Sequence, residues 1–214
     1  MLWEVIFLFA VAGDTSAATV VDRIAVIVGK HVIKLSDIQR DLRLTEFMNR
    51  EPLNLDSSER HKSADRLIDQ AMIRDEIARG GYRRPADSDA NRLLNQLRHD
   101  RFGGSDSRLQ EELSRFGISE GQLRNQFLWQ LTVLSFIDQR FRPSVQLNDD
   151  EIVSYYNQHL PELEKEYPQN NAFAVLQPKI SALLEGQRIN QNFLAWLEQA
   201  RQRNHIEYRQ GAFQ

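Results

Sequence analysis

The alternation of apolar and polar positions near the start of the chain predicts a β-hairpin that leads directly into a helix. Apolar runs cover residues 20–28 and 31–34, with Gly29-Lys30 between them. Glycine accepts a positive φ at the first position of a two-residue turn, so the two runs are expected to pair as antiparallel strands. Ser36 then stands at a helix N-cap position, and Gln39 would complete a capping box.

Farther along, apolar residues recur at helical spacing and predict a mainly helical chain. Ser119 with Gln122, and Asn148 with Glu151, form two more capping-box patterns. The expected helices cover residues 36–49, 58–79, 105–116, 119–142 and 173–204. Another helix is expected to begin after an N-cap at Asp87 or Ser88 and to stop at Gly103, and a further one to run from residue 148 through Tyr156.

Two strands alone are marginally stable in water, so the hairpin needs a partner. Residues 206–209 alternate apolar and polar side chains and are the best candidate for a third strand. The pattern therefore predicts a mainly α fold, in which a multi-helix core carries a small β-sheet formed by the N-terminal hairpin and a C-terminal strand.

Composition narrows the classes of function. The chain has 214 residues, of which 41% are hydrophobic, enough for one large or two small domains. The formal net charge of −3 comes without a basic cluster, which argues against nucleic acid as a partner. Cysteine is absent, so disulfides, a thiol nucleophile and cysteine-ligated metal are excluded.

The first residues resemble an export signal. Residues 2–11 are mostly apolar, and Ser16-Ala17-Ala18 supply the small residues that a signal peptidase reads. Residues 1–18 are therefore expected to be a signal peptide; a misassigned start or a buried N-terminal element are the alternatives. No later segment is apolar enough to span a membrane, so no integral span is expected in the mature chain.

Several segments, taken in order, resemble the SurA-type periplasmic chaperones of the SurA N-terminal domain family. They are the hairpin with its capped helix, residues 66–73, 116–124 and 145–156, and residues 196–201 together with 206–208. The resemblance implies a periplasmic chaperone core. Residues 19–160 would form its N-terminal chaperone region, residues 161–172 the linker where relatives insert a parvulin domain, and residues 173–214 the C-terminal helix and strand.

The chain departs from that family in the part that carries its enzymatic activity. Fewer residues separate Tyr156 from Phe173 than the ~50 that even a small folded domain needs. The parvulin motifs are also missing, and Gly103-Gly104-Ser105-Asp106, which imitates one of them, is better explained as a helix stop followed by a cap. The chain is therefore expected to be no enzyme, with no catalytic residues.

The sequence offers no cofactor or metal site either. The five histidines are scattered, and no two have the i,i+4 spacing of a helix-face metal site. The acidic run Asp149-Asp150-Glu151 has two explanations, a cation site or the preference of acids for a helix N-terminus, and the second is favoured.

Candidate client-binding residues lie beside helix ends. Phe47 and Met48 precede Pro52, and Phe102 and Phe116 lie next to glycine stops. A chaperone of unfolded chains needs exposed apolar surface with adaptable contacts, which these side chains would supply. The alternative is that they close the core between helices. Trp129, Trp196 and Phe127 are expected in the core.

The best interpretation is an exported, ATP-independent holdase for unfolded polypeptides, with outer-membrane protein precursors as the clients that the resemblance implies. One alternative is a non-catalytic assembly subunit that pairs with an isomerase-bearing chaperone. Self-association of the chain is a further candidate interaction. Another is a residual peptidyl-prolyl isomerase.

Overall fold

The computed structural model describes residues 22–214 and shows a mainly helical chain with one small sheet, as the sequence predicts. The predicted signal peptide, residues 1–18, lies outside the described residues. The helices are α1 (Leu35–Asn49), α2 (Ser57–Gly80), α3 (Asp87–Phe102), α4 (Asp106–Phe116), α5 (Glu120–Phe141), α6 (Asp149–Gln158), α7 (Leu160–Glu166) and α8 (Phe173–Arg203). The strands are β1 (Ile24–Val28), β2 (His31–Lys34) and β3 (Ile206–Tyr208).

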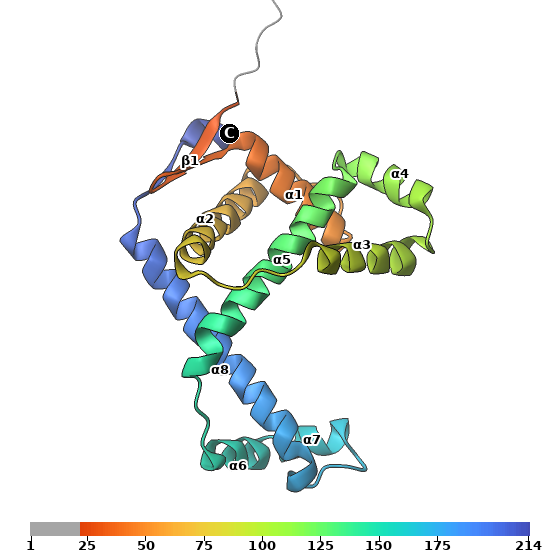
Figure 1. Cartoon of the computed structure of the whole chain (residues 1–214), viewed down its shortest axis with the longest axis vertical. Helices are drawn as coiled ribbons and strands as arrows, with labels where there is room; N and C mark the ends of the chain where they lie inside the picture. Colours follow the sequence, from red (N-terminus) through yellow and green to blue (C-terminus); the bar gives the residue numbers. More distant parts are fainter. Residues whose placement is uncertain (1–21) are drawn as a thin grey trace, which may run out of the picture.

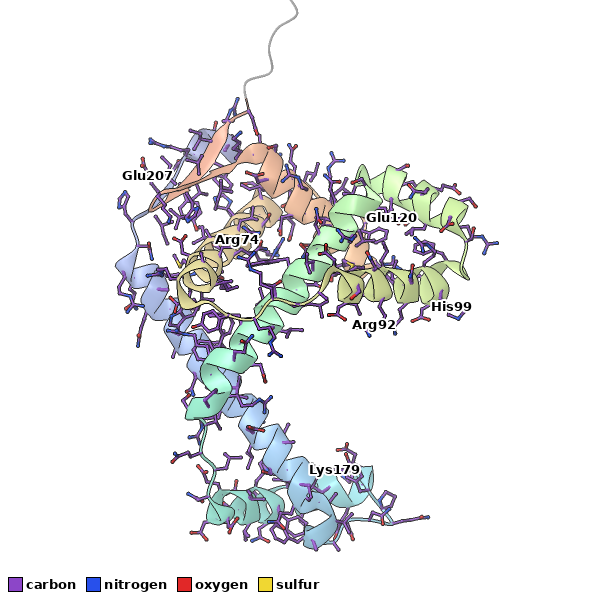
Figure 2. The ribbon with its side chains drawn as sticks, viewed as in Figure 1. Arg74, Arg92, His99, Glu120, Lys179 and Glu207 are labelled. Carbon is purple, nitrogen blue, oxygen red and sulfur yellow. The ribbon has the colours of Figure 1, made fainter. Side chains whose placement is uncertain are left out.

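The helices give the molecule an open, C-shaped outline (Figure 1). The sheet, α1 and α2 form a body, from which α3 and α4 project as an arm. The long α5 and α8 cross below the body, and α8 continues into a foot that it shares with α6 and α7. The side chains do not fill the space between arm and foot (Figure 2).

The sheet joins the two ends of the described chain, as predicted. Its order is β2-β1-β3, and both pairings are antiparallel. Gly29 has a φ of +55° in the hairpin turn, a conformation that glycine adopts without strain. Val28 pairs with Ile206 on one side and with His31 on the other, so β1 is the central strand. Ala25, Val26 and Val28 of this strand are buried.

The predicted start of the first helix is wrong. The helix begins at Leu35, directly after β2, and Lys34 occupies the N-cap position. The Lys34 amide donates to the Asp37 carboxylate at 3.0 Å, and the Ser36 hydroxyl donates instead to Asp22 at 2.5 Å. Because the strand runs into the helix without a connector, Ser36 lies inside the first turn and Gln39 completes no capping box.

The other helix starts follow the sequence signals more closely. The capping boxes of Ser119 with Gln122 and of Asn148 with Glu151 are confirmed at the starts of α5 and α6. At α3 the prediction is one residue off, since Ala86 is the N-cap and its amide donates to the Asp89 carboxylate at 3.2 Å. A side chain three residues inside a helix can thus satisfy an N-cap amide when the N-cap residue has no polar group.

The segment predicted as a linker, residues 161–172, contains most of α7 and is therefore not simply a connector. Pro161 falls in the first turn of α7, where its missing amide hydrogen costs nothing. The foot core consists of residues from α6, α7, α8 and the segment between α7 and α8. Its members are Ile152, Leu176 and Ile180, with Tyr155, Tyr156, Leu163, Tyr167, Phe173 and Leu184 packed against them.

Helix α8 belongs to two cores on opposite sides of its axis. Its N-terminal half contacts the foot through Phe173, Leu176, Ile180 and Leu184. Its C-terminal half packs on α2 and α5 through Ile189, Phe193, Trp196 and Leu197. At 3.6 residues per turn, these two sets lie about 200° apart around the axis. The helix therefore holds the foot on the side opposite to the body, and Pro178 lies within it without ending it.

Closure of the sheet by the C-terminal segment should control the stability of the whole body. Ala212 and Phe213, just after β3, are 2% and 4% exposed and belong to the core under the sheet. We expect Phe213→Ala to lower the free energy of unfolding by roughly 3–5 kcal/mol, and deletion of residues 205–214 to do at least as much. Urea denaturation measures both, and an unchanged midpoint in the deletion variant would contradict this closure.

Tyr208 on β3 should make stability depend on alkaline pH. Burial and the hydrogen bond of 2.5 Å that its hydroxyl donates to Asp65 raise the pKa of Tyr208 to about 12. The neutral form is therefore favoured in the folded state, and its contribution is complete below pH 10.0 and is lost as the pH rises toward 12. The difference in free energy of unfolding between the wild type and Tyr208→Phe should therefore shrink as the pH rises across that interval. A difference that does not change with pH would contradict this role of Tyr208.

Candidate functional site

The four residues predicted to bind clients lie together, but in the core of the arm. The arm core consists of Leu44, Phe47, Ala90, Leu94, Leu109, Leu113, Ile118, Leu123 and Phe127. Phe47 is 0% exposed and packs edge-on against Phe116, with ring centroids 5.6 Å apart. Met48, Phe102 and Phe116 are half-buried against the same core.

Phe47 is therefore a correction to the predicted site, since a fully enclosed ring offers no surface to a client. The helix end that favoured exposure is covered because α1 reaches into the arm, where Arg101 lies 4.6 Å above the Phe47 ring. The partial exposure of Met48, Phe102 and Phe116 leaves their role in client binding a prediction. Phe127 lies in the arm core, and Trp129 and Trp196 are half-buried beside the junction of α2, α5 and α8, as expected.

Exposed apolar surface lies instead mainly on the helices that lead to the foot. Nine large apolar side chains are exposed among the described residues, and five of them belong to α5, α6 and α8. Those five are Leu134, Val153, Val175, Leu183 and Leu194. Singly scattered apolar residues are ordinary on a protein surface, so the arrangement of these five decides whether they can form a binding surface.

Leu183 and Leu194 form a stripe that the sequence interpretation missed. They are 44% and 52% exposed, and the eleven residues between their positions correspond to about three helical turns. Both lie in line with Leu176, which the foot core buries. That side of α8 therefore carries two exposed leucines beyond the foot core, with the polar Gln187 and Asn190 between them. The two leucines together are called here the α8 stripe. The sequence signal for these exposed positions is the recurrence of leucine along one side of α8, at Leu176, Leu183 and Leu194.

A hollow between the sheet and two helices is polar. It has a volume of about 800 Å³ and lies between the hairpin, α2 and the C-terminal half of α8. Four cationic side chains and two acidic ones line it, so its field is positive. The cationic lining residues are Lys30, Arg79, Arg140 and Arg203, and the acidic ones are Asp75 and Glu76.

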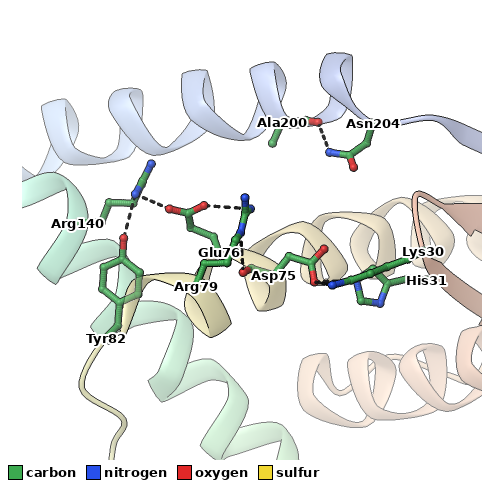
Figure 3. Close-up of polar contacts among 9 residues, drawn as sticks. All are labelled: Lys30, His31, Asp75, Glu76, Arg79, Tyr82, Arg140, Ala200 and Asn204. Carbon is green, nitrogen blue, oxygen red and sulfur yellow. Dashed lines mark hydrogen bonds and ion pairs between the residues drawn. The ribbon is translucent and has the colours of Figure 1, made fainter.

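Both acids of this polar groove are engaged in ion pairs that tie the elements together (Figure 3). Asp75 on α2 accepts from His31 at 2.8 Å and lies 3.4 Å from the Lys30 ammonium group. Partial burial raises the pKa of Asp75, but the hydrogen bond and the charges of His31 and Lys30 outweigh it and hold that pKa below its ordinary value. The geometry therefore fastens the hairpin to α2.

Glu76 makes the equivalent connection to α5. Its carboxylate lies 2.5 Å from Arg140 and 3.2 Å from Arg79, and Arg140 also donates to the Tyr82 hydroxyl at 2.9 Å. The Arg140 guanidinium lies 5.5 Å from the Trp196 ring on α8. This network has no unpaired carboxylate for acid–base chemistry, so its arrangement is that of a junction between helices.

The acidic run at the start of α6 is explained by the helix itself. The Glu151 carboxylate accepts from the Asn148 amide at 3.2 Å and pairs with Arg188 at 3.0 Å. These contacts, the amide first, lower the pKa of Glu151. No group of three or more acidic or histidine side chains within residues 22–214 is arranged to hold a metal ion.

Comparisons with family models and curated proteins identify no relative of this chain. No family model matches the chain, and no curated protein matches it. No helix within the described range is long and apolar enough to cross a membrane. The candidate functional surfaces therefore rest on the contacts and exposure of this chain's own residues.

The burial of Phe47 has a direct consequence for mutation. Phe47→Ala removes a ring that is 0% exposed, so the free energy of unfolding should fall by roughly 3–5 kcal/mol. Leu134→Gln is the control, since Leu134 is 63% exposed and its substitution should change stability by no more than about 0.5 kcal/mol. Equal melting temperatures for the two variants would contradict the assignment of Phe47 to the arm core.

Proposed function

We propose that this chain is an exported, ATP-independent holdase that binds unfolded polypeptides, with outer-membrane protein precursors in the periplasm as its clients. The observation that carries the proposal is that Leu183 and Leu194 are both exposed on one side of α8, a long helix beside the open side of a C-shaped molecule. The order of sequence segments that resembles SurA-type chaperones and the apolar N-terminal segment support export and this class of client.

The physical basis is transient burial of client apolar surface. Each Å² of apolar surface removed from water contributes about 25 cal/mol, so a few exposed leucines stabilise a complex only weakly. Weak contacts at several places suit a holdase, because the client must be released without nucleotide hydrolysis. The rigid packing of α8 between the junction and the foot keeps the stripe presented to solvent.

The same α8 stripe would also serve the assembly-subunit alternative, in which the chain pairs with an isomerase-bearing chaperone. Light scattering of the chain mixed with such a chaperone distinguishes the two functions. An assembly subunit forms a complex without client that dissociates when Leu183 and Leu194 are both replaced by Gln, whereas a holdase forms no such complex.

The holdase proposal makes a prediction for an aggregation assay with an unfolded β-barrel client. The double variant Leu183→Gln/Leu194→Gln should protect the client less than the wild type, while each substitution changes stability by no more than about 0.5 kcal/mol. Leu53→Gln is the matched control, since Leu53 is exposed in the connector between α1 and α2 and its replacement should leave protection unchanged. Equal client protection by the wild type, the double variant and Leu53→Gln would show that Leu183 and Leu194 do not bind the client.

The proposed function includes no prolyl isomerisation. Between α6 and α8 the chain forms α7 and a short connector, which replaces the parvulin domain of the family that the sequence resembles. A proline-limited refolding reaction should therefore keep its slow phase at stoichiometric amounts of this protein. Acceleration of that phase by substoichiometric protein would instead support the residual-isomerase alternative.

A further inference from the structure

Two neighbouring hollows meet at Arg74 of α2. The first, of about 270 Å³, is lined by β2, α1, α2 and Gln126 of α5. The second, of about 580 Å³, lies between α2, α5 and the connector that carries Arg84 and Pro85. Arg74 lines both hollows and lies between α2 and α5 (Figure 2). The two hollows therefore adjoin each other at Arg74, and together they are called here the Arg74 groove.

The first hollow lies along the free edge of the sheet. Three consecutive β2 residues, His31, Val32 and Ile33, line it, and their side chains alternate in direction, so the hollow is at the strand's edge rather than over one face. Within residues 22–214, the strand order β2-β1-β3 gives this edge of β2 no partner strand. An edge of this kind is a template for another extended chain.

The pairing pattern shows which backbone groups this edge offers. The Gly29 amide donates to His205 and the Arg209 amide donates to Ala25, so the odd-numbered residues of β1 bond to β3. In an antiparallel ladder the directions alternate, and Ile27 is therefore bonded to β3 as well. Its neighbour across the hairpin, Val32, consequently turns its amide and carbonyl away from β1 toward the groove. The Val32 side chain is 49% exposed there.

The second hollow combines an aromatic ring with a cation. The Arg74 guanidinium lies 4.4 Å from the centre of the Trp129 ring, and its polar partner is the Gln70 side chain at 3.0 Å. Surrounding protein withdraws part of this guanidinium from water and lowers the pKa of Arg74. The Arg74 side chain nevertheless remains exposed, with the Trp129 ring on one side of its guanidinium.

Three arginines, Arg40, Arg74 and Arg84, and three acids line the groove, but ion pairing leaves Arg74 and Arg84 without an acidic partner among residues 22–214. The acids that line it are each paired: Asp37 with Arg40, Asp41 with Arg66, and Asp87 with Arg124. None of the ion pairs within residues 22–214 includes Arg74 or Arg84. The groove is thus complementary to an occupant that carries a carboxylate beside an apolar side chain.

We propose that the Arg74 groove binds an extended segment of an unfolded polypeptide. The segment adds backbone hydrogen bonds at Val32, places a carboxylate against Arg74 and packs an apolar side chain on Trp129. A polypeptide is the occupant because the groove offers a strand edge, a cation and an aromatic ring in series, and an extended chain supplies the matching groups. This inference rests on the proposed holdase function and identifies a client site separate from the stripe on α8.

Peptide binding tests the inference directly. The probes are three short peptides of alternating Val and Tyr: one with a central Glu and an amidated end, one with Gln and an amidated end, and one with Gln and a free terminal carboxylate. The wild type should bind at least one carboxylate peptide about tenfold more tightly than the amidated Gln peptide, because a charge-assisted hydrogen bond adds specificity of that order. Comparing the two carboxylate peptides identifies which carboxylate the groove takes.

Arg74→Gln should abolish this preference, and Arg92→Gln is the control, since Arg92 is 73% exposed on α3, outside the groove. Hydrogen exchange of the Val32 amide should slow about tenfold when the preferred peptide is saturating. A preference that survives Arg74→Gln, or a Val32 amide whose exchange does not change, would overturn the inference. Client protection by the wild type without any peptide preference would overturn this site alone, whereas the loss of both peptide binding and protection would overturn the holdase function itself.

Discussion

Pairing of β1 with β3 is the contact on which the arrangement of the other elements depends. It joins segments from the two ends of the described chain, and closing so long a loop costs chain entropy. Burial of Val26 in the sheet and of Ala212 and Phe213 after it offsets that cost, because all three belong to one core with α1 and α2. Since α8 leads directly into β3, the closed sheet also fixes the end of α8 against α2. The direction of the whole foot follows from that placement.

The second constraint is the two-sided packing of α8. One side of α8 packs at the junction with α2 and α5, and the opposite side packs on α6 and α7. A single helix therefore connects two separate cores. Ion pairs from Arg142 to Glu185 at 2.9 Å and from Arg188 to Glu151 at 3.0 Å lie where the two cores meet. The open outline results from this connection, and the apolar positions between the two cores remain exposed.

The proposed client surfaces differ in what they recognise. The stripe on α8 offers apolar area without direction, which any unfolded chain can cover. The Arg74 groove offers backbone groups, a cation and a ring in a fixed order, which selects for an extended segment with a carboxylate. A chaperone that combines both can bind many clients weakly and hold one kind of segment in register. The polar groove behind them serves as a structural junction, because both of its carboxylates are engaged.

The sequence by itself determined the local structure: the hairpin at Gly29, the capping boxes at Ser119 and Asn148, and a third strand near 206, since these depend on neighbouring residues. It did not determine which side of a helix is covered, because that depends on segments distant in the chain. Phe47 lies beside a helix end and yet is enclosed by the arm, whereas Leu183 and Leu194 have core-like spacing and yet are exposed. The Arg74 groove likewise exists only because folding brings β2, α2 and α5 together. Tertiary packing alone decided which apolar residues are exposed.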